Sequence, residues 1–196
     1  DGLPFDAAVN ERLKGIDRAT SLRIILDHAQ RVAAPADFAA MMARKNSYYR
    51  QLIAAFTPND LFTGVSDLLS ACRRAGLKIG LASASRNAAE LVERLGIASQ
   101  FDYMADSALI TNAKPDPEIF LTTAAALGIA PSRCVGVEDA VAGVRAINAA
   151  GMHSVGIGDP SVLSHADLIA PTIAKLNISA ILEGFPAAEF RRQTTN

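Results

Sequence analysis

The chain has 196 residues, which is enough for one ordinary domain or for a core domain with a small second domain. Half of its residues are hydrophobic and only 20% are charged, so it can bury a sizeable core and bulk disorder is excluded. The formal net charge of -1 gives no reason to expect nucleic acid or an anionic membrane surface as a partner.

The first 56 residues show only helical patterns. Apolar residues recur at helical spacing in two groups: Leu22, Ile25, Leu26 and Ala29, and then Phe38, Met41, Met42, Tyr49 and Ile53. Either Asp17 or Thr20 is placed to cap the first helix, and Pro35 is suited to open the second. A turn-rich stretch follows at residues 57–64. We therefore predict a helical domain over residues 1–57 and a second domain over residues 58–196.

Beyond this break, helices alternate with short apolar strands. The predicted strands cover 78–82, 101–105, 134–137, 154–157 and 168–170, and the predicted helices cover 64–75, 86–95, 116–127, 140–150 and 173–183. At the start of the third of these helices, Asp116 is a natural N-cap and Pro117 fits the first helical position. Alternating strands and helices predict an α/β fold with right-handed crossovers and a parallel sheet.

Polar side chains follow the predicted strands at one edge of the sheet. Ser83 ends the strand 78–82, Glu138 and Asp139 end the strand 134–137, and Lys114 precedes a helix. Ligands of open parallel sheets bind beyond the carboxyl ends of the strands. A hydroxyl and an ammonium group suit phosphoryl oxygens, whereas paired carboxylates suit a hard cation such as Mg²⁺. The arrangement therefore predicts a phosphate site beside Mg²⁺.

Each of these residues also has a purely structural interpretation. Ser83 is equally placed to be a simple helix N-cap, and a single lysine such as Lys114 is most often a solvated surface charge. Glu138 and Asp139 could cap a helix and interact with its dipole. These alternatives stay open from the residues alone.

Two longer motifs carry a family resemblance. The segment from Lys114 to Phe120 (KPDPEIF) and the segment from Gly136 to Gly143 (GVEDAVAG) resemble motifs of the haloacid dehalogenase superfamily of phosphotransferases, in the subgroup with a helical cap. The resemblance implies a parallel, Rossmann-like core with a small helical cap domain. It also implies that Ser83 and Lys114 are catalytic, as a phosphate-binding hydroxyl and a phosphate clamp, and that Glu138 and Asp139 are the acids on the Mg²⁺ side.

The N-terminal helices resemble the cap of the sugar-phosphate mutases in this superfamily, through residues 13–22 and 43–46. The resemblance implies substrate-binding positions at Lys14, Gly15, Arg18, Ser21, Lys45 and Asn46 in the cap and at Ser83, Ala84, Arg86, Asn87 and Lys114 in the core. Arg18 and Ser21 are three residues apart and share a helix face. The alternative is a basic, solvated face. Arg86 stands where the family usually has lysine.

The first motif of the superfamily, a strand that ends in D-x-D-G, does not occur in these 196 residues. Its first aspartate is the family's nucleophile, its second is the acid/base, and its strand lies in the middle of the family's sheet. We therefore expect the chain to be an incomplete record of a longer functional protein, and we expect no turnover from the chain as it stands.

For the intact protein, the resemblance implies a cytoplasmic enzyme, a monomer, that uses Mg²⁺ to isomerise a hexose phosphate through an aspartyl phosphate and a bisphosphate. The cytoplasmic setting also fits Cys72 and Cys134, which lack the spacing of a metal site. Two alternatives are a sugar-phosphate phosphatase of the same superfamily and a non-catalytic remnant that binds phosphate or a partner protein.

Overall fold

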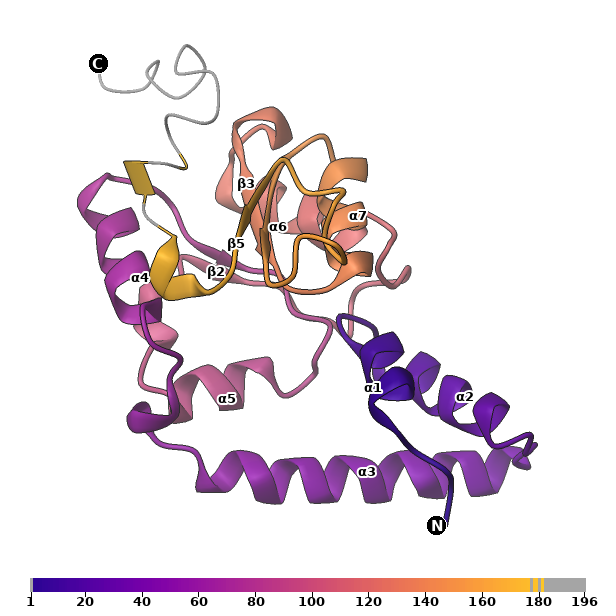
Figure 1. The fold of residues 1–196 in the computed structure, drawn as a ribbon. Helices are drawn as coiled ribbons and strands as arrows, with labels where there is room; N and C mark the ends of the chain where they lie inside the picture. The colour runs from indigo at the N-terminus through magenta and orange to yellow at the C-terminus, as the bar shows by residue number, and fades with distance from the viewer. Residues whose placement is uncertain (1, 177, 180, 182–196) are drawn as a thin grey trace.

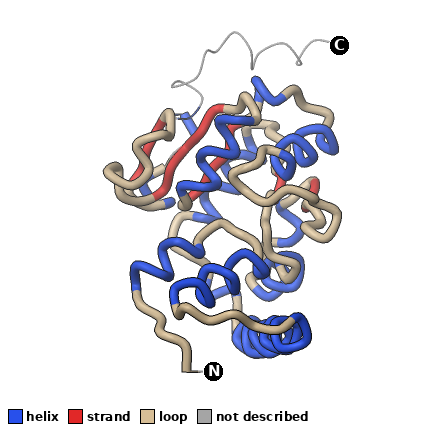
Figure 2. The backbone as a smooth tube through the Cα atoms, turned by 90° about the vertical axis from the view of Figure 1, so that its right-hand side faces the viewer, coloured by secondary structure: helices blue, strands red, loops and turns tan. Residues whose placement is uncertain are grey.

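The structure is a computed structural model, which describes every residue except 1, 177, 180 and 182–196. Figure 1 shows an α/β part in the upper half and the N-terminal helices in the lower half, where a long helix runs along the bottom. Turned by 90°, Figure 2 shows the strands enclosed by helices in the upper half and only helices and loops below. This confirms the predicted α/β class with a helical unit beside it.

The N-terminal helices are α1 (Ala7–Leu13), α2 (Arg18–His28) and α3 (Pro35–Ala55). Asp17 caps α2, because its carboxylate accepts hydrogen bonds from the backbone N–H groups of Ala19 at 2.8 Å and Thr20 at 3.1 Å. Of the two candidate caps, Asp17 is therefore the one used. Pro35 opens α3 as predicted. Val9, Leu22 and Leu26 on α1 and α2, and Ile53 near the end of α3, are buried apolar side chains of these helices.

The α/β part follows the predicted alternation. Its elements are α4 (Val65–Arg74), β1 (Gly80–Leu81), α5 (Ala88–Arg94), β2 (Tyr103–Met104), α6 (Glu118–Leu127), β3 (Val135–Glu138), α7 (Val141–Ala149), β4 (His153–Ile157) and β5 (Leu168–Ala170). Every paired strand is parallel to its neighbour. The predicted helix 173–183 begins instead as a 3-10 turn at Ile173–Lys175, and several of its later residues lie outside the described part.

The start of α6 differs from the prediction by two residues. The helix begins at Glu118 with Pro117 as its cap residue, whereas Asp116 was expected to cap it. Asp116 lies one position further out and accepts the Glu118 N–H at 2.9 Å, so it still satisfies a free backbone donor of the first turn. The predicted closing glycine is confirmed, because Gly128 adopts a left-handed φ of 69° at the end of α6.

The parallel strands of the described residues form two separate sheets. β1 pairs with β2, whereas β3, β4 and β5 form a separate three-stranded sheet in that order. Within the described residues, β3 therefore pairs on one side only, and so does β1. β1 and β2 are two residues long, shorter than the predicted strands 78–82 and 101–105.

Helices cover both faces of the three-stranded sheet. Val135 and Leu68 of α4 pack against the same buried cluster, whereas a Cβ on the next residue, Gly136, would meet Ile147 of α7 at 2.5 Å. Successive residues of a strand point to opposite faces, so α4 and α7 lie on opposite sides of β3. Ile147 and Val155 are fully buried. Each such side chain contributes roughly 1.5–3 kcal/mol of transfer free energy.

Three polar contacts join α3 to the α5 region. The Asn87 side-chain amide donates to Asn46 at 3.0 Å, and Arg50 pairs with Glu90 at 3.2 Å. Arg94 donates to the carbonyl of Ala54 at 3.5 Å. These contacts fix the long helix against the α/β part. The domain division at residues 57 and 58 stays a prediction.

Candidate active site

The four residues predicted at the strand ends lie around one cavity. Ser83, Lys114, Glu138 and Asp139 all line a cavity of about 580 Å³ at the carboxyl ends of β1 and β3, here called the strand-end pocket. Apolar side chains such as Phe62 and Val137 form much of the remaining wall. This geometry confirms the prediction that the ends of these strands lie at one edge of the fold.

Lys114 is held at the centre of this site. Its ammonium group donates to the Ala82 carbonyl at 3.2 Å and to the Glu138 carboxylate, and it lies 4.7 Å from the centre of the Phe120 ring. Lys114 is only 8% exposed. The interpretation of Lys114 as a solvated surface charge is therefore wrong. The ammonium group is a fixed cation that joins the end of β1 to the end of β3.

Glu138 is bonded on both carboxylate oxygens. One oxygen accepts from Lys114, and the other accepts the backbone N–H groups of Asp139 at 3.0 Å and Ala140 at 3.3 Å. Gly143 of α7 makes room for it, because a Cβ at that position would overlap the Glu138 carboxyl group. Glu138 therefore positions Lys114 and at the same time caps the turn that leads into α7.

Asp139 has the electrostatics of a cation ligand. Desolvation raises the pKa of its carboxyl group, and the neighbouring charge of Glu138 raises it further. A bound cation would relieve both effects. Mg²⁺ commonly uses one or two carboxylates, keeps several waters and takes its remaining oxygens from a substrate phosphate. The two carboxylates fit that role, although no group of three or more His, Cys, Asp or Glu residues converges within the described residues.

Ser83 lies in a turn rather than at a helix cap. Its hydroxyl oxygen accepts the Ser85 N–H at 3.2 Å, whereas α5 starts later and has Asn87 as its cap residue. The interpretation of Ser83 as a simple N-cap is therefore wrong. Because the hydroxyl accepts this bond, its own proton is left to donate to an anion in the strand-end pocket.

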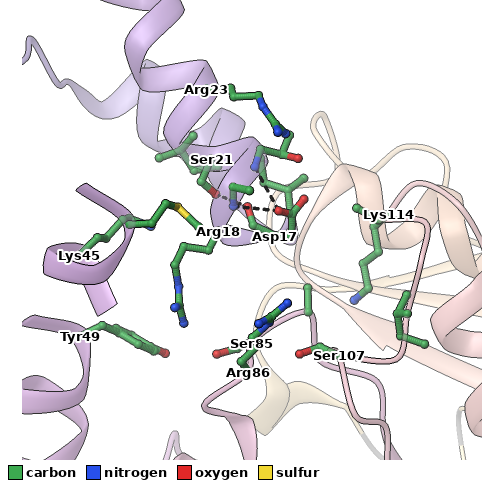
Figure 3. Close-up of a pocket in the computed structure, with 18 of the residues that line it drawn as sticks. Asp17, Arg18, Ser21, Arg23, Lys45, Tyr49, Ser85, Arg86, Ser107 and Lys114 are labelled. Carbon is green, nitrogen blue, oxygen red and sulfur yellow. Dashed lines mark hydrogen bonds between the residues drawn. The ribbon is translucent and has the colours of Figure 1, made fainter. Parts of the chain in front are cut away.

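A larger cavity of about 1390 Å³ lies between the N-terminal helices and the strand ends, and it is here called the cap cavity. Figure 3 shows Arg18 and Lys45 on the helical side, with Arg86 and Lys114 on the opposite side. The predicted substrate residues that line this cavity are Arg18, Ser21, Lys45, Ala84, Arg86 and Lys114. Lys114 lines both cavities, so they share one wall.

The helical side of the cap cavity is basic. Desolvation lowers the pKa of Lys45, and the nearby charge of Arg18 lowers it further. Ser21 lies on the same helix as Arg18, is 4% exposed, and donates its hydroxyl to the Asp17 carbonyl at 2.8 Å. An anion between Arg18 and Lys45 would relieve their mutual repulsion.

Besides Ser83, which lines the strand-end pocket, four predicted substrate residues do not line the cap cavity. The Lys14 ammonium group forms an ion pair with the Glu11 carboxylate at 2.7 Å. Lys14 lines neither of the two cavities. Asn46 and Asn87 bond to each other rather than facing the cap cavity. Gly15 lines the strand-end pocket; it has a φ of 73°, and a Cβ there would lie 2.7 Å from that of Ala140. Glycine is thus required at position 15 both by its conformation and by its close approach to α7.

Several residues that line the cap cavity were not predicted from the sequence. Tyr49 lies four residues after Lys45 on α3, and that helical spacing could have identified it. Ser107 follows β2 at the same sheet edge as Ser83, so its position after a strand was the available signal. Arg23 also lines the cavity and stacks over Phe38, with its guanidinium carbon 5.6 Å from the ring centre.

A fixed lysine and paired carboxylates at the edge of a parallel α/β sheet, facing a basic helical unit, suit a phosphorylated ligand. The family model for haloacid dehalogenase-like hydrolases matches residues 5–151, and the chain belongs to this family.

Two comparisons point to one member of the family. β-Phosphoglucomutase of Bacillus subtilis (strain 168) is 42% identical over 183 residues, which is 92% of this chain and 81% of that protein. The crystal structure of β-phosphoglucomutase from Clostridium difficile superimposes with a TM-score of 0.91 at 40% identity, covering 95% of this chain and 85% of that one. The chain is thus a homologue of β-phosphoglucomutase.

Sugar-phosphate phosphatases are also similar. Hexitol phosphatase B of Escherichia coli (strain K12) is 31% identical over 125 residues, which is 63% of this chain and 55% of that protein. Sequence similarity therefore establishes that the chain belongs to this class of enzymes, but it does not distinguish a mutase from a phosphatase. In the part of the chain that the structure describes, we find no helix with the length and apolar character needed to span a membrane.

Proposed function

We propose that these residues form the substrate-binding body of a β-phosphoglucomutase, which interconverts β-glucose 1-phosphate and glucose 6-phosphate with Mg²⁺. One observation carries the proposal: the chain presents two cationic sites on opposite sides of two cavities that share part of their walls. Lys114 lies at the strand-end pocket, and Arg18 and Lys45 lie across the cap cavity. Two anion sites are what a bisphosphate intermediate requires, because one phosphate is transferred while the other is held.

The roles of the individual side chains follow from their positions. Lys114 and the Ser83 hydroxyl neutralise the phosphoryl group that moves, and Glu138 holds the Lys114 ammonium in place. Arg18 and Lys45 hold the distant phosphate, Arg18 through a planar fork and Lys45 through a point charge. When bound beside Asp139, Mg²⁺ would offset charge on the transferred oxygens. Closure of the helical unit over the substrate would exclude water, which otherwise competes for the phosphoryl group.

The nucleophile is not assigned to any of the 196 residues. The family's attacking aspartate belongs to D-x-D-G, which does not occur in this sequence. We expect the 196-residue chain to bind hexose phosphates without turning them over. Mutase activity of this chain by itself would contradict that assignment.

The test is a coupled assay of the gene product with each anomer of glucose 1-phosphate and a trace of glucose bisphosphate. We expect glucose 6-phosphate to form from the β anomer, and calorimetric binding of glucose 6-phosphate to the 196-residue chain. Release of orthophosphate without glucose 6-phosphate would overturn the mutase proposal. That result would favour the second candidate, a sugar-phosphate phosphatase, which the similarity to hexitol phosphatase B supports.

A further inference from the structure

Ser107 carries a hydroxyl group that the described fold leaves without a partner. Its Oγ atom is buried and forms no hydrogen bond within the described residues. A buried polar group without a partner costs roughly 1–3 kcal/mol. The other such atom, Nε of Arg133, belongs to a residue that is not among those lining either cavity, whereas Ser107 lines the cap cavity. A ligand in the cap cavity would supply the partner that the described residues do not provide.

The backbone around Ser107 is held firmly. The Ala105 N–H donates to the Leu81 carbonyl at 2.9 Å, and the Ala108 N–H donates to the Asp106 carboxylate at 2.8 Å. Further along the loop, the Glu118 carboxylate accepts the N–H groups of the next segment, Thr111 at 2.8 Å and Asn112 at 2.7 Å. The loop is thus tied to β1 on one side and to α6 on the other. A side chain on such a loop binds a ligand with little loss of entropy.

The surroundings indicate which part of a ligand Ser107 would contact. In Figure 3 its side chain lies between the Ser85–Arg86 turn and Lys114. Those cations suit phosphate oxygens, whereas a neutral hydroxyl both donates and accepts, as a sugar hydroxyl does. Rotation about the Cα–Cβ bond moves the hydroxyl among three staggered positions on a side chain that already lines the cap cavity.

We propose that Ser107 is a specificity residue that hydrogen-bonds a ring hydroxyl of the bound sugar phosphate. The inference rests on the proposed function, because it requires a hexose phosphate in the cap cavity. It goes further by assigning recognition of the sugar, as distinct from its phosphate, to the loop after β2. Ser107 thereby helps to separate hexose phosphates from smaller phosphorylated molecules.

The test compares the parent chain with Ser107→Ala by titration calorimetry, using glucose 6-phosphate, its monodeoxy analogues and orthophosphate. We expect Ser107→Ala to weaken glucose 6-phosphate about three- to tenfold. The deoxy analogue that lacks the hydroxyl bonded by Ser107 should bind the parent chain about three- to tenfold less tightly than glucose 6-phosphate does. Its affinity for Ser107→Ala should be the same as for the parent chain. Orthophosphate affinity should not change. The melting temperature should stay level or rise, since the hydroxyl has no partner to lose.

Ser99→Ala is the matched control, because Ser99 is exposed and is not among the residues lining either cavity. It should behave as the parent chain with every ligand. If Ser107→Ala discriminates among the deoxy analogues as the parent chain does, the inference is overturned and the proposed function stands. If the parent chain binds orthophosphate but no hexose phosphate, both fall. A lower melting temperature with unchanged sugar affinity would assign Ser107 a structural role and also overturn the inference.

Discussion

The ammonium group of Lys114 and the carboxylate of Glu138 form an ion pair that ties the loop before α6 to the end of β3. Their side chains are only 5% and 10% exposed. Removing one partner leaves a buried charge uncompensated, so we expect Lys114→Met to lower the free energy of unfolding by about 3–5 kcal/mol. Adding Glu138→Gln should recover part of that loss. Urea denaturation of the parent chain, the two single variants and the double variant measures the coupling between the two residues. If the losses of the two single variants simply add in the double variant, the side chains do not form a direct pair.

The same lysine should matter more for chemistry than for binding. Lys114→Ala is expected to lower kcat of the active gene product by about 10²–10³, because a preorganised cation is lost beside the moving phosphoryl group. Steady-state kinetics with β-glucose 1-phosphate checks this. An unchanged kcat with a raised KM would show that Lys114 binds substrate and transition state equally.

Gly143→Ala tests whether α7 makes room for Glu138. Alanine favours helices over glycine by about 1 kcal/mol, so an ordinary helical site would be stabilised by this change. Here a Cβ would overlap the Glu138 carboxyl group, and we expect a net loss of about 1–3 kcal/mol in unfolding free energy. In a Glu138→Ala background the overlap disappears, and Gly143→Ala should then be stabilising. Destabilisation in both backgrounds would indicate a different clash.

Asn46 and Asn87 should behave as one unit, because their side chains bond to each other at 3.0 Å across α3 and the start of α5. We expect a double-mutant cycle with alanine at both positions to give a coupling of about 0.5–1.5 kcal/mol in unfolding free energy. The Arg50–Glu90 pair nearby is more exposed and should give a smaller coupling. Zero coupling between the asparagines would mean that their contact does not persist in solution.

Arg18→Ala should distinguish the role of the anion site in the cap cavity from that of the anion site at Lys114. If Arg18 holds the phosphate that is not transferred, its loss should impair mutase turnover more than hydrolysis of a small phosphoryl donor such as acetyl phosphate. Parallel assays on one enzyme preparation give the ratio directly. An equal loss in both reactions would argue against a phosphate site on the helical side of the cap cavity.

Acid should weaken the contact between α4 and the loop before β2. Arg73 donates to both carboxylate oxygens of Asp102, at 2.8 and 2.9 Å, and these hydrogen bonds lower the pKa of Asp102. The backbone N–H of Ile79 also donates to Asp102, at 2.7 Å, and lowers that pKa further. A lowered folded pKa contributes stability above the ordinary value of 3.8, and that stability is lost as the pH falls through the folded value. Asp102→Asn should therefore flatten the decline in melting temperature below about pH 4. If the melting temperature of Asp102→Asn falls with acid as steeply as that of the parent chain, other carboxyl groups cause the decline.

The order of helices and strands was predictable because local signals agree with the fold. Glycines close helices, as at Gly128, and apolar runs alternate with them. The strand-end pocket was predictable for a topological reason: parallel strands deliver their carboxyl ends to one edge. The contact between Asn46 and Asn87 was not predictable, because it joins residues 41 positions apart through the packing of α3 on α5. A role for Ser107 was not predictable from the sequence, because only the three-dimensional structure shows that its buried hydroxyl has no hydrogen-bond partner among the described residues.

The division of the sheet has a consequence for handling the protein. Val137, in the middle of β3, is 39% exposed, and β3 is an edge strand of its sheet. Unpaired main-chain groups on such a strand act as a template for strands of neighbouring molecules. Turbidity and light scattering of the 196-residue chain should therefore rise with concentration, and a lysine at position 137 should delay this by placing a charge on that strand.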